Sequence, residues 1–430
     1  MSAPNIVLLV IDALRADAVR GGGPFEAATP TLDRLKEESV SFACAIAQSG
    51  HTRGSVPALM AGGYPLVDGL EGALPAERPV LPEVLCDAGY TTAAVHCNPF
   101  LSRAFGFERG FGHFDDSAGS SNRLLVFLRR CWNTLSSRPY VPGPELVRRA
   151  LDRVRQTPQP FFLWLHLMDV HGPYLPHGDV GIGRRRAARL WRRSIRHPGQ
   201  ITPEDRNLLM RLYAGEVAFA DRCVADFLAG LRSAVDADGT VLAVTADHGE
   251  QFLEHGMYNH PRHLYDEQVR VPLLLRGPGI RPADVGRQVQ LLDLPSTLCR
   301  LAGVPVPACW RGQDLLEPAD PERPAFSETT GYWETSDEDI YAVRTAERKH
   351  LSHLKDGSVV HEEGYDLTND PGETRNVLAE QGSDEAWNEM RRLLREHIES
   401  GDRRHGSKTC DAAPNDADLR RRLEALGYLE

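Results

Sequence analysis

Two carboxylates and an imidazole in this sequence have the residue types and the placement that a metal site requires. Asp12 ends a run of aliphatic residues that begins at Asn5, and Asp247 and His248 follow a second such run, 240–245. Runs of this kind are typical of strands that are buried on both faces. Ligands of open α/β sheets bind outside the carboxyl ends of the strands. If the two strands are neighbours, the three side chains converge and can hold a divalent cation.

The two aspartates also have a simpler interpretation. Asp is a frequent cap of helices and turns, so Asp12 and Asp247 can each serve the segment that follows it. Sequence spacing alone leaves the metal site and the caps equally open.

A third stretch, 48–62, suits an anion rather than a cation. It begins with the small and hydroxyl-bearing residues around Gln48-Ser49-Gly50-His51-Thr52 and continues into an apolar segment. This pattern predicts a loop that enters a helix. The free N–H groups and the dipole at such a helix N-terminus favour a tetrahedral anion.

The elements that must position these residues alternate along the first three quarters of the chain. Strands are predicted at 5–12, 41–46, 91–96, 160–167, 240–245 and 271–275. Helices are predicted at 29–35, 82–88, 145–155, 184–196 and 208–234. This alternation predicts an α/β fold, with a largely parallel central sheet flanked by helices on both faces.

From about residue 320 the composition becomes acidic and rich in turn residues. Short antiparallel strands are predicted at 340–344, 350–354 and 359–365, followed by a helix at 384–398, a polar link at 401–418 and a last helix at 419–426. We therefore predict a large domain, 1–319, and a smaller C-terminal α+β subdomain, 320–430.

Composition narrows the classes of partner. A net charge of −11 argues against nucleic acid. No apolar run approaches the ~20 residues of a spanning helix, so no membrane segment is expected. Strand-like sequence begins at once without a basic leader, which favours a cytoplasmic protein.

The segment 184–196 carries seven arginines. It is either a solvated helix face or a lid that attracts an anionic substrate.

Several motifs follow one another from one end of the chain to the other. They are the segments 5–17, 29–35, 52–65, 98–111, 169–174, 213–221, 245–250, 264–279, 365–377 and 423–429. In this order and spacing they resemble the sulfatase family of the alkaline phosphatase superfamily. The resemblance implies an alkaline phosphatase-like fold, a catalytic role for the large domain, and metal-dependent chemistry on sulfate or phosphate esters.

The resemblance assigns the metal site to Asp12, Asp247 and His248. Many relatives carry a second Asp directly after the first, and here that position is Ala13. One carboxylate is therefore missing. The oxygen-rich ligand set favours one divalent ion, Ca²⁺, Mg²⁺ or Mn²⁺.

The family's nucleophile is a Cys or Ser that is oxidised to formylglycine, in a C/S-x-P-S-R motif ten residues before the Gly of an L-x-x-G element. Counting back from Gly62 places Thr52 there, in Thr52-Arg53-Gly54-Ser55-Val56. Thr cannot become formylglycine, so no formylglycine is expected. A Thr alkoxide held as a metal ligand is still a competent nucleophile, and Thr serves the superfamily's phosphodiesterases and lipoteichoic-acid-type phosphoglycerol transferases. The substitution points towards phosphorus chemistry; a helix cap and a site that has lost catalysis are the alternatives.

Around the anion, the resemblance places His171 as a hydrogen-bond donor or acid. It places His260 where relatives carry a Lys or His that neutralises the anion. Arg53 is a candidate replacement for the motif's Arg, which is Val56 here. The weaker candidates for substrate binding are His51, Asn98 and His263. Each histidine can instead be a structural hydrogen-bonding residue.

The sequence thus predicts a one-metal hydrolase or transferase of small anionic esters, with phosphate esters preferred. A sulfuric ester hydrolase that works without formylglycine and a non-catalytic anion-binding protein remain as alternatives. The sequence does not indicate an oligomeric state.

Overall fold

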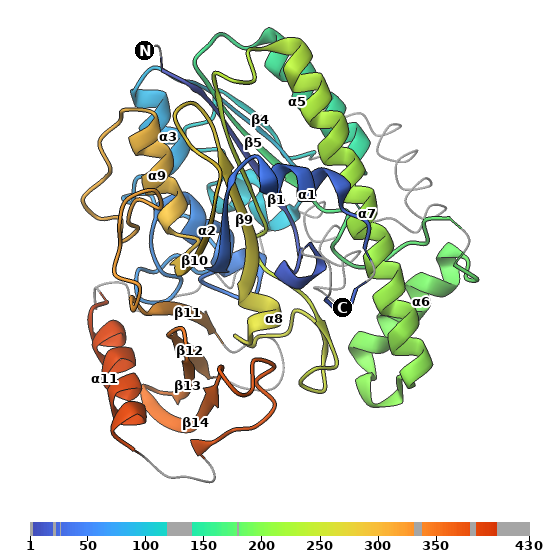
Figure 1. The fold of residues 1–430 in the computed structure, drawn as a ribbon, viewed down its shortest axis with the longest axis vertical. Helices are drawn as coiled ribbons and strands as arrows, with labels where there is room; N and C mark the ends of the chain where they lie inside the picture. The colour runs from blue at the N-terminus through green and yellow to red at the C-terminus, as the bar shows by residue number, and fades with distance from the viewer. Residues whose placement is uncertain are drawn as a thin grey trace.

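The computed structural model describes residues 3–19, 23–25, 27–117, 140–178, 180–330, 338–378 and 384–401. Within them, eight strands form one large sheet (Figure 1). Their order is β10 (Ala283–Gln290), β2 (Val40–Ile46), β9 (Arg270–Arg276), β6 (Thr240–Thr245), β1 (Asn5–Ile11), β5 (Phe161–Leu167), β3 (Thr91–Val95) and β4 (His113–Asp115). Neighbouring strands are parallel except in the pairs β2–β9 and β6–β9. The predicted α/β fold with a largely parallel sheet is confirmed.

Strand β1 lies inside the sheet because six of its seven residues are aliphatic and all seven are buried. Its neighbours β5 and β6 both run parallel to it. In this register Val10 lies opposite His166 of β5 and Thr245 of β6. The carboxyl ends of the three strands therefore meet at one edge of the sheet, which brings Asp12 and Asp247 to the same place.

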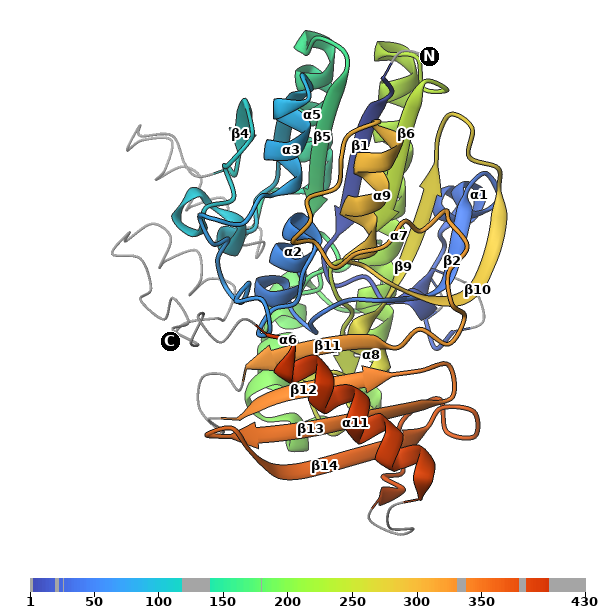
Figure 2. The same ribbon diagram turned by 90° about the vertical axis from the view of Figure 1, so that its left-hand side faces the viewer.

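Two groups of helices cover the two faces of the large sheet (Figure 2). One group is α1 (Pro30–Glu37), α5 (Gly143–Gln156) and α7 (Pro203–Ala234), and the other is α2 (Thr52–Ala61), α3 (Leu81–Asp87) and α9 (Asp293–Leu301). Helix α5 packs through an apolar stripe at helical spacing, formed by Leu146, Val147, Ala150, Leu151 and Val154. Helix α7 begins at Thr202, whose side chain accepts a hydrogen bond from the Asp205 N–H.

The arginine-rich segment is helix α6 (Arg184–Arg196), which packs against α7. Leu190 and Trp191 are buried, whereas all seven arginines are exposed. The shorter elements are η1 (Ala16–Ala18), η2 (Pro99–Leu101), η3 (Arg103–Phe105), η4 (Pro198–Gln200), β7 (Gln251–Phe252), β8 (Tyr258–Asn259) and α8 (Asp266–Val269).

A second sheet has four antiparallel strands, β11 (Ala325–Thr330), β12 (Asp339–Arg344), β13 (Arg348–Lys355) and β14 (Ser358–Asp366), in that order. Helix α11 (Glu385–Glu399) packs on one face, through Trp387, Met390 and Leu394. The other face buries Leu351 and Tyr365 against Leu264 and Tyr265, which directly precede α8. Figure 2 shows these strands running across the direction of the large sheet, beyond the end where β1 finishes.

The short or polar strands β4, β10 and β11 were not predicted, because their sequences lack a sustained apolar pattern. The predicted last helix, 419–426, and nearly all of the polar link, 401–418, lie outside the described residues.

A buried ion cluster joins the two sheets. The Lys349 ammonium on β13 lies 3.0 Å from Asp266 Oδ1 and 2.8 Å from Glu373 Oε1. Arg344 on β12 holds the same Asp266 carboxylate at 2.8 Å. Asp266 belongs to α8, which leads directly into β9, so this cluster fixes the C-terminal sheet to the large sheet.

Replacing Lys349 by Met is expected to lower the free energy of unfolding by about 3–5 kcal/mol, because removing one partner leaves buried charge uncompensated. Urea unfolding measures the change. Lys355→Met is the matched control, since Lys355 is exposed at the end of the same strand. Equal effects of the two substitutions would show that the cluster does not stabilise the contact between the sheets.

Candidate active site

The carboxylates and imidazoles at the end of the large sheet form one buried cluster. Ligand atoms of Asp12, His166 and Asp247 all lie within 4.8 Å of one another. His248 Nε2 lies 3.6 Å from Asp12 Oδ1 and 3.7 Å from Asp247 Oδ2. The four side chains are fully buried. The predicted trio of Asp12, Asp247 and His248 is thus brought together, and His166 of β5 joins it.

One oxygen of each aspartate in this cluster could serve as a ligand of a cation. Asp12 Oδ2 is paired with His166 Nε2 at 3.0 Å and accepts a hydrogen bond from the Asn98 side-chain amide at 2.9 Å. Asp12 Oδ1 and Asp247 Oδ2, in contrast, accept no hydrogen bond from any residue that the structure describes. Buried carboxylate oxygens without a donor are costly unless they are paired with positive charge.

The pKa shifts in the cluster have the causes expected of a charged pair. Burial acts to raise the pKa of Asp12, but the hydrogen bond with His166 and the nearby imidazoles outweigh it and hold that pKa well below its usual range. Burial and the Asp12 charge raise the pKa of Asp247. Burial acts to lower the pKa of His248, and the two carboxylates outweigh it and raise that pKa. The donor set therefore fits a divalent cation, which would relieve the repulsion between the two carboxylates.

Thr52 is the first residue of helix α2, and it points at this cluster. Its Oγ1 lies 3.3 Å from His248 Nε2. The N-cap residue, His51, makes no side-chain capping hydrogen bond, so no side-chain cap occupies the N–H groups of the first turn. A hydroxyl, two buried carboxylates and the N-terminus of a helix are therefore adjacent.

A hydrogen bond fixes α2 to the strand that carries Asp247. The buried Ser55 hydroxyl donates to the Asp247 backbone carbonyl at 2.6 Å. Ser55→Ala is expected to lower the free energy of unfolding by about 1–3 kcal/mol, because a buried carbonyl loses its donor. Ser233→Ala is the control: its hydroxyl also donates to a backbone carbonyl, that of Ala229, but in an exposed position. Denaturant midpoints that shift equally for both variants would contradict the expectation.

The C-terminal sheet holds the loop that precedes Thr52. The Glu328 N–H on β11 donates to the Gln48 carbonyl at 2.7 Å. The Ser327 hydroxyl donates to the Ala47 carbonyl, also at 2.7 Å. His51 Nε2 is paired with the Thr329 hydroxyl at 3.0 Å. Strand β11 of the C-terminal sheet therefore holds the loop through three consecutive residues.

Close packing explains one departure from the family motif. A Cβ on Gly54 would lie 2.6 Å from the Ser49 Cβ and 2.8 Å from Glu71 Oε2. The structure therefore requires Gly where the motif has Pro.

The Arg53 guanidinium lies over the Phe100 ring, 5.6 Å from its centroid, at the side of the site that holds Glu71.

His171 and His260 lie together beside the cluster. Their ring centroids are 4.9 Å apart, and the His260 ring is 4.5 Å from that of His248. His260 Nδ1 is paired with Glu250 Oε1 at 3.1 Å, and the Tyr174 hydroxyl donates to Glu250 Oε2 at 2.7 Å. Burial raises the pKa of Glu250 to about 7. Glu250 thus orients His260.

The remaining predicted residues lie in different places. The Asn98 side-chain amide donates to Asp12, so Asn98 orients a carboxylate of the cluster. His263 lies next to Tyr265, with a ring distance of 5.4 Å, near the C-terminal sheet. Ala13 has a φ of +59°, a left-handed conformation that Asp and Asn adopt more readily than Ala does.

Sequence reasoning ranked His166 only among the weakest candidates and gave Glu250 no role. His166 stands inside a buried apolar strand, where its only signal is a polar residue among apolar ones. Glu250 follows the Asp247–His248 pair, and no pattern in the sequence links it to His260. Both roles depend on contacts between segments that are distant in sequence.

Comparison with known proteins agrees with this architecture. A sequence model described as Sulfatase matches residues 4–304, and one described as N-sulphoglucosamine sulphohydrolase, C-terminal, matches residues 253–400. The chain is 29% identical over 192 residues to arylsulfatase K of Danio rerio, which covers 42% of this chain and 36% of that protein. It is 31% identical over 201 residues to Delta 4,5-hexuronate-2-O-sulfatase of Bacteroides thetaiotaomicron, covering 44% of this chain and 41% of that protein. The alignments thus span less than half of these curated relatives.

Solved structures share the fold over nearly the whole chain. A 2-O GAG sulfatase superposes with a TM-score of 0.72 at 22% identity, covering 93% of this chain and 92% of that chain. A phosphonate monoester hydrolase of Agrobacterium radiobacter superposes with a TM-score of 0.75 at 19% identity, covering 92% and 96%. The predicted alkaline phosphatase-like fold is confirmed. Among the described residues, no helix combines the length and the apolar character that crossing a membrane requires.

Proposed function

This chain belongs to the sulfatase family, and we propose that it cleaves phosphate esters by a nucleophilic mechanism that begins at Thr52. One observation carries the proposal: Thr52 Oγ1 lies 3.3 Å from His248 Nε2, at the N-terminus of α2, which has no side-chain cap, and next to two buried carboxylates. A threonine that only capped this helix would not need that cluster in front of it.

Asp12, Asp247 and His248, together with Thr52, would hold a divalent cation such as Ca²⁺, Mg²⁺ or Mn²⁺, which lowers the pKa of a nearby hydroxyl and neutralises charge on an ester when it is bound. His166 and Asn98 orient Asp12 through its second oxygen. Such outer partners keep a ligand in the geometry that binding requires.

In the proposed reaction, Thr52 loses its hydroxyl proton to solvent and its oxygen forms a bond to phosphorus. The ester P–O bond breaks, and the leaving oxygen receives a proton from His171, which lies beside His260. Water, or an acceptor alcohol in a transferase, then gives a proton back to His171 and attacks phosphorus. The bond to Thr52 breaks, and the Thr52 oxygen takes up a proton from solvent. The N–H groups at the start of α2 stabilise the negative charge on the oxygens of the group in transfer.

Phosphate is preferred over sulfate because of the residue at position 52. Thr cannot form the aldehyde hydrate through which the family releases sulfate. A phosphoryl group on a threonine oxygen is instead released by a second displacement at phosphorus. The relatives that carry sulfatase names favour the second candidate, a sulfuric ester hydrolase that works without formylglycine.

The test is an assay of the purified full chain on p-nitrophenyl phosphate, bis-p-nitrophenyl phosphate and p-nitrophenyl sulfate, each with Ca²⁺, Mg²⁺ or Mn²⁺. We expect turnover of at least one phosphate ester to exceed that of the sulfate ester. Faster turnover of the sulfate would support the second candidate. No turnover of any ester with any ion would count heavily against the proposed enzyme and favour the non-catalytic anion-binding protein.

A further inference from the structure

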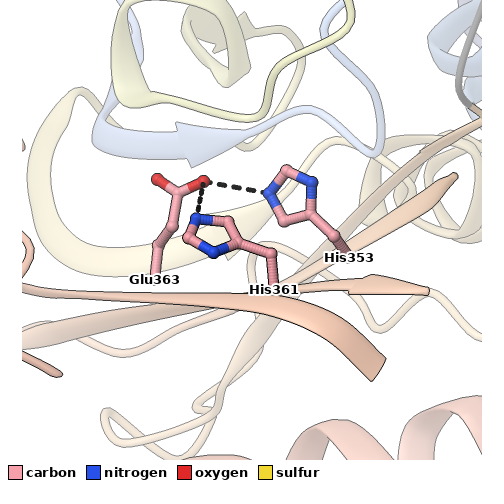
Figure 3. A group of neighbouring side chains, drawn as sticks. All are labelled: His353, His361 and Glu363. Atoms are coloured by element: carbon pink, nitrogen blue, oxygen red, sulfur yellow. Dashed lines mark hydrogen bonds and ion pairs between the residues drawn. The ribbon is translucent and has the colours of Figure 1, made fainter. Parts of the chain in front are cut away.

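A second group of metal-binding side chains lies on the C-terminal sheet, on β13 and β14. His353 and His361 are directly opposite each other in the antiparallel register of these strands. Opposite residues project to the same face of a sheet, and so do residues two apart on one strand. His353, His361 and Glu363 therefore share one face, and Figure 3 shows both imidazoles turned towards the Glu363 carboxylate.

The distances between these side chains match those within a zinc site. Glu363 Oε1 lies 2.9 Å from His353 Nε2 and 3.7 Å from His361 Nε2. All three ligand atoms lie within 4.8 Å of one another. With metal–ligand bonds of about 2.0–2.1 Å, the ligand atoms of a tetrahedral zinc site are about 3.3 Å apart. The two measured distances fall on either side of that value.

Neighbouring groups hold two of the three ligands in place. Glu363 Oε2 accepts hydrogen bonds from the Tyr265 hydroxyl at 2.7 Å and the Tyr365 hydroxyl at 2.5 Å, which leaves Oε1 facing the imidazoles. His353 presents its other nitrogen, Nδ1, to Glu338 Oε2 at 3.3 Å. A carboxylate behind an imidazole is the usual support of a metal-binding histidine, because it fixes the ring and makes it a better ligand.

We propose that His353, His361 and Glu363 bind a transition-metal ion of the zinc class, independently of the reaction proposed for Thr52. Two imidazoles and one carboxylate suit Zn²⁺ better than Ca²⁺ or Mg²⁺, which take mainly oxygen ligands. Three protein ligands leave a fourth position for water or an anionic group. The His361 side chain is 58% exposed and gives an ion access, whereas those of His353 and Glu363 are 10% and 9% exposed.

The location of this site relates it to the active-site loop. Thr329, Ile340 and His353 lie opposite one another in one row across β11, β12 and β13. Strands are about 4.8 Å apart, so His353 is about 10 Å from Thr329 along the sheet. Thr329 is the residue that contacts His51, next to Thr52. A cation on His353 therefore adds positive charge to the face of the sheet that adjoins the active site.

The test measures the equivalents of zinc bound per full chain at a buffered free Zn²⁺ concentration. Wild type is expected to retain one equivalent more than His361→Ala. Glu338→Gln, which changes only an outer partner, is expected to keep the site with an affinity lower by about 10- to 100-fold. His197→Ala is the matched control, because His197 is also exposed but lies beyond the end of α6; it should retain zinc like wild type.

The same comparison in an Asp247→Asn background separates this site from the active site, because a difference of one equivalent should persist there. Equal zinc retention by wild type and His361→Ala would overturn the proposal and leave Glu363 as the partner of a protonated His353. Circular dichroism and the Tm of His361→Ala establish that the variant is folded, as the exposure of His361 leads us to expect.

Discussion

Replacing Thr52 by Val is expected to lower kcat by about 10³- to 10⁶-fold on any ester that the wild type cleaves, because the variant keeps the shape of the side chain and loses its only nucleophilic atom. Thr52→Ser retains a hydroxyl at the same position and should keep measurable turnover. At a saturating metal concentration, the metal content of Thr52→Val is expected to match that of wild type, since the other three proposed ligands, Asp12, Asp247 and His248, remain.

The control for this experiment is Thr157→Val. The Thr157 hydroxyl donates to the Arg153 carbonyl at 2.7 Å, at the end of α5 that precedes β5 and so at the opposite edge of the large sheet from Asp12. Steady-state kinetics and metal analysis on the three variants then separate loss of the nucleophile from loss of the fold. Wild-type kcat in Thr52→Val would exclude Thr52 as the nucleophile and leave the metal site untouched.

Asp247→Asn is expected to remove the metal and to stabilise the metal-free protein. The two effects have one cause, since Asp247 and Asp12 are buried carboxylates, and each has one oxygen that accepts no hydrogen bond from the described residues. Without a cation they repel each other, and this repulsion helps to raise the pKa of Asp247. Neutralising one carboxylate should raise the free energy of unfolding in chelator by about 1–3 kcal/mol, as often happens when a functional site is removed.

Metal analysis and urea unfolding, each with and without chelator, measure both effects. Asp284→Asn is the control, because Asp284 is exposed on β10. It should keep the metal and the wild-type stability. A variant at Asp247 that loses stability in chelator, or keeps its full metal content, would show that the cluster is a structural network rather than a cation site.

The sequence was informative where one segment carries the whole signal. An aliphatic run that stops at Asp12, and another that stops before Asp247, identify two buried strands and two carboxylates at the same edge of the sheet. Helices such as α5 are recognisable for the same reason, since their apolar stripe is local.

The sequence was uninformative where the signal is divided between segments. Strand β10 begins with exposed residues and contains Gly286, and β11 consists largely of polar residues. Each becomes a strand through its pairing, with β2 and with β12. The pairing of Glu250 with His260, and that of His353 with His361 and Glu363, likewise follow from tertiary contacts. Neither pairing produces a spacing that a motif can describe.

The bonds between β11 and the loop before Thr52 set an order of events during translation. Ser327 and Ala47, which are joined by a hydrogen bond, are 280 residues apart in the chain. At about 5–20 residues per second, a ribosome needs about 14–56 s to add that stretch. During this interval a growing chain can pair β1 with β5 and then with β6. The loop before Thr52 still lacks its contacts with β11 at that stage. The site is therefore completed late in synthesis, after the strands that carry its acidic residues have formed.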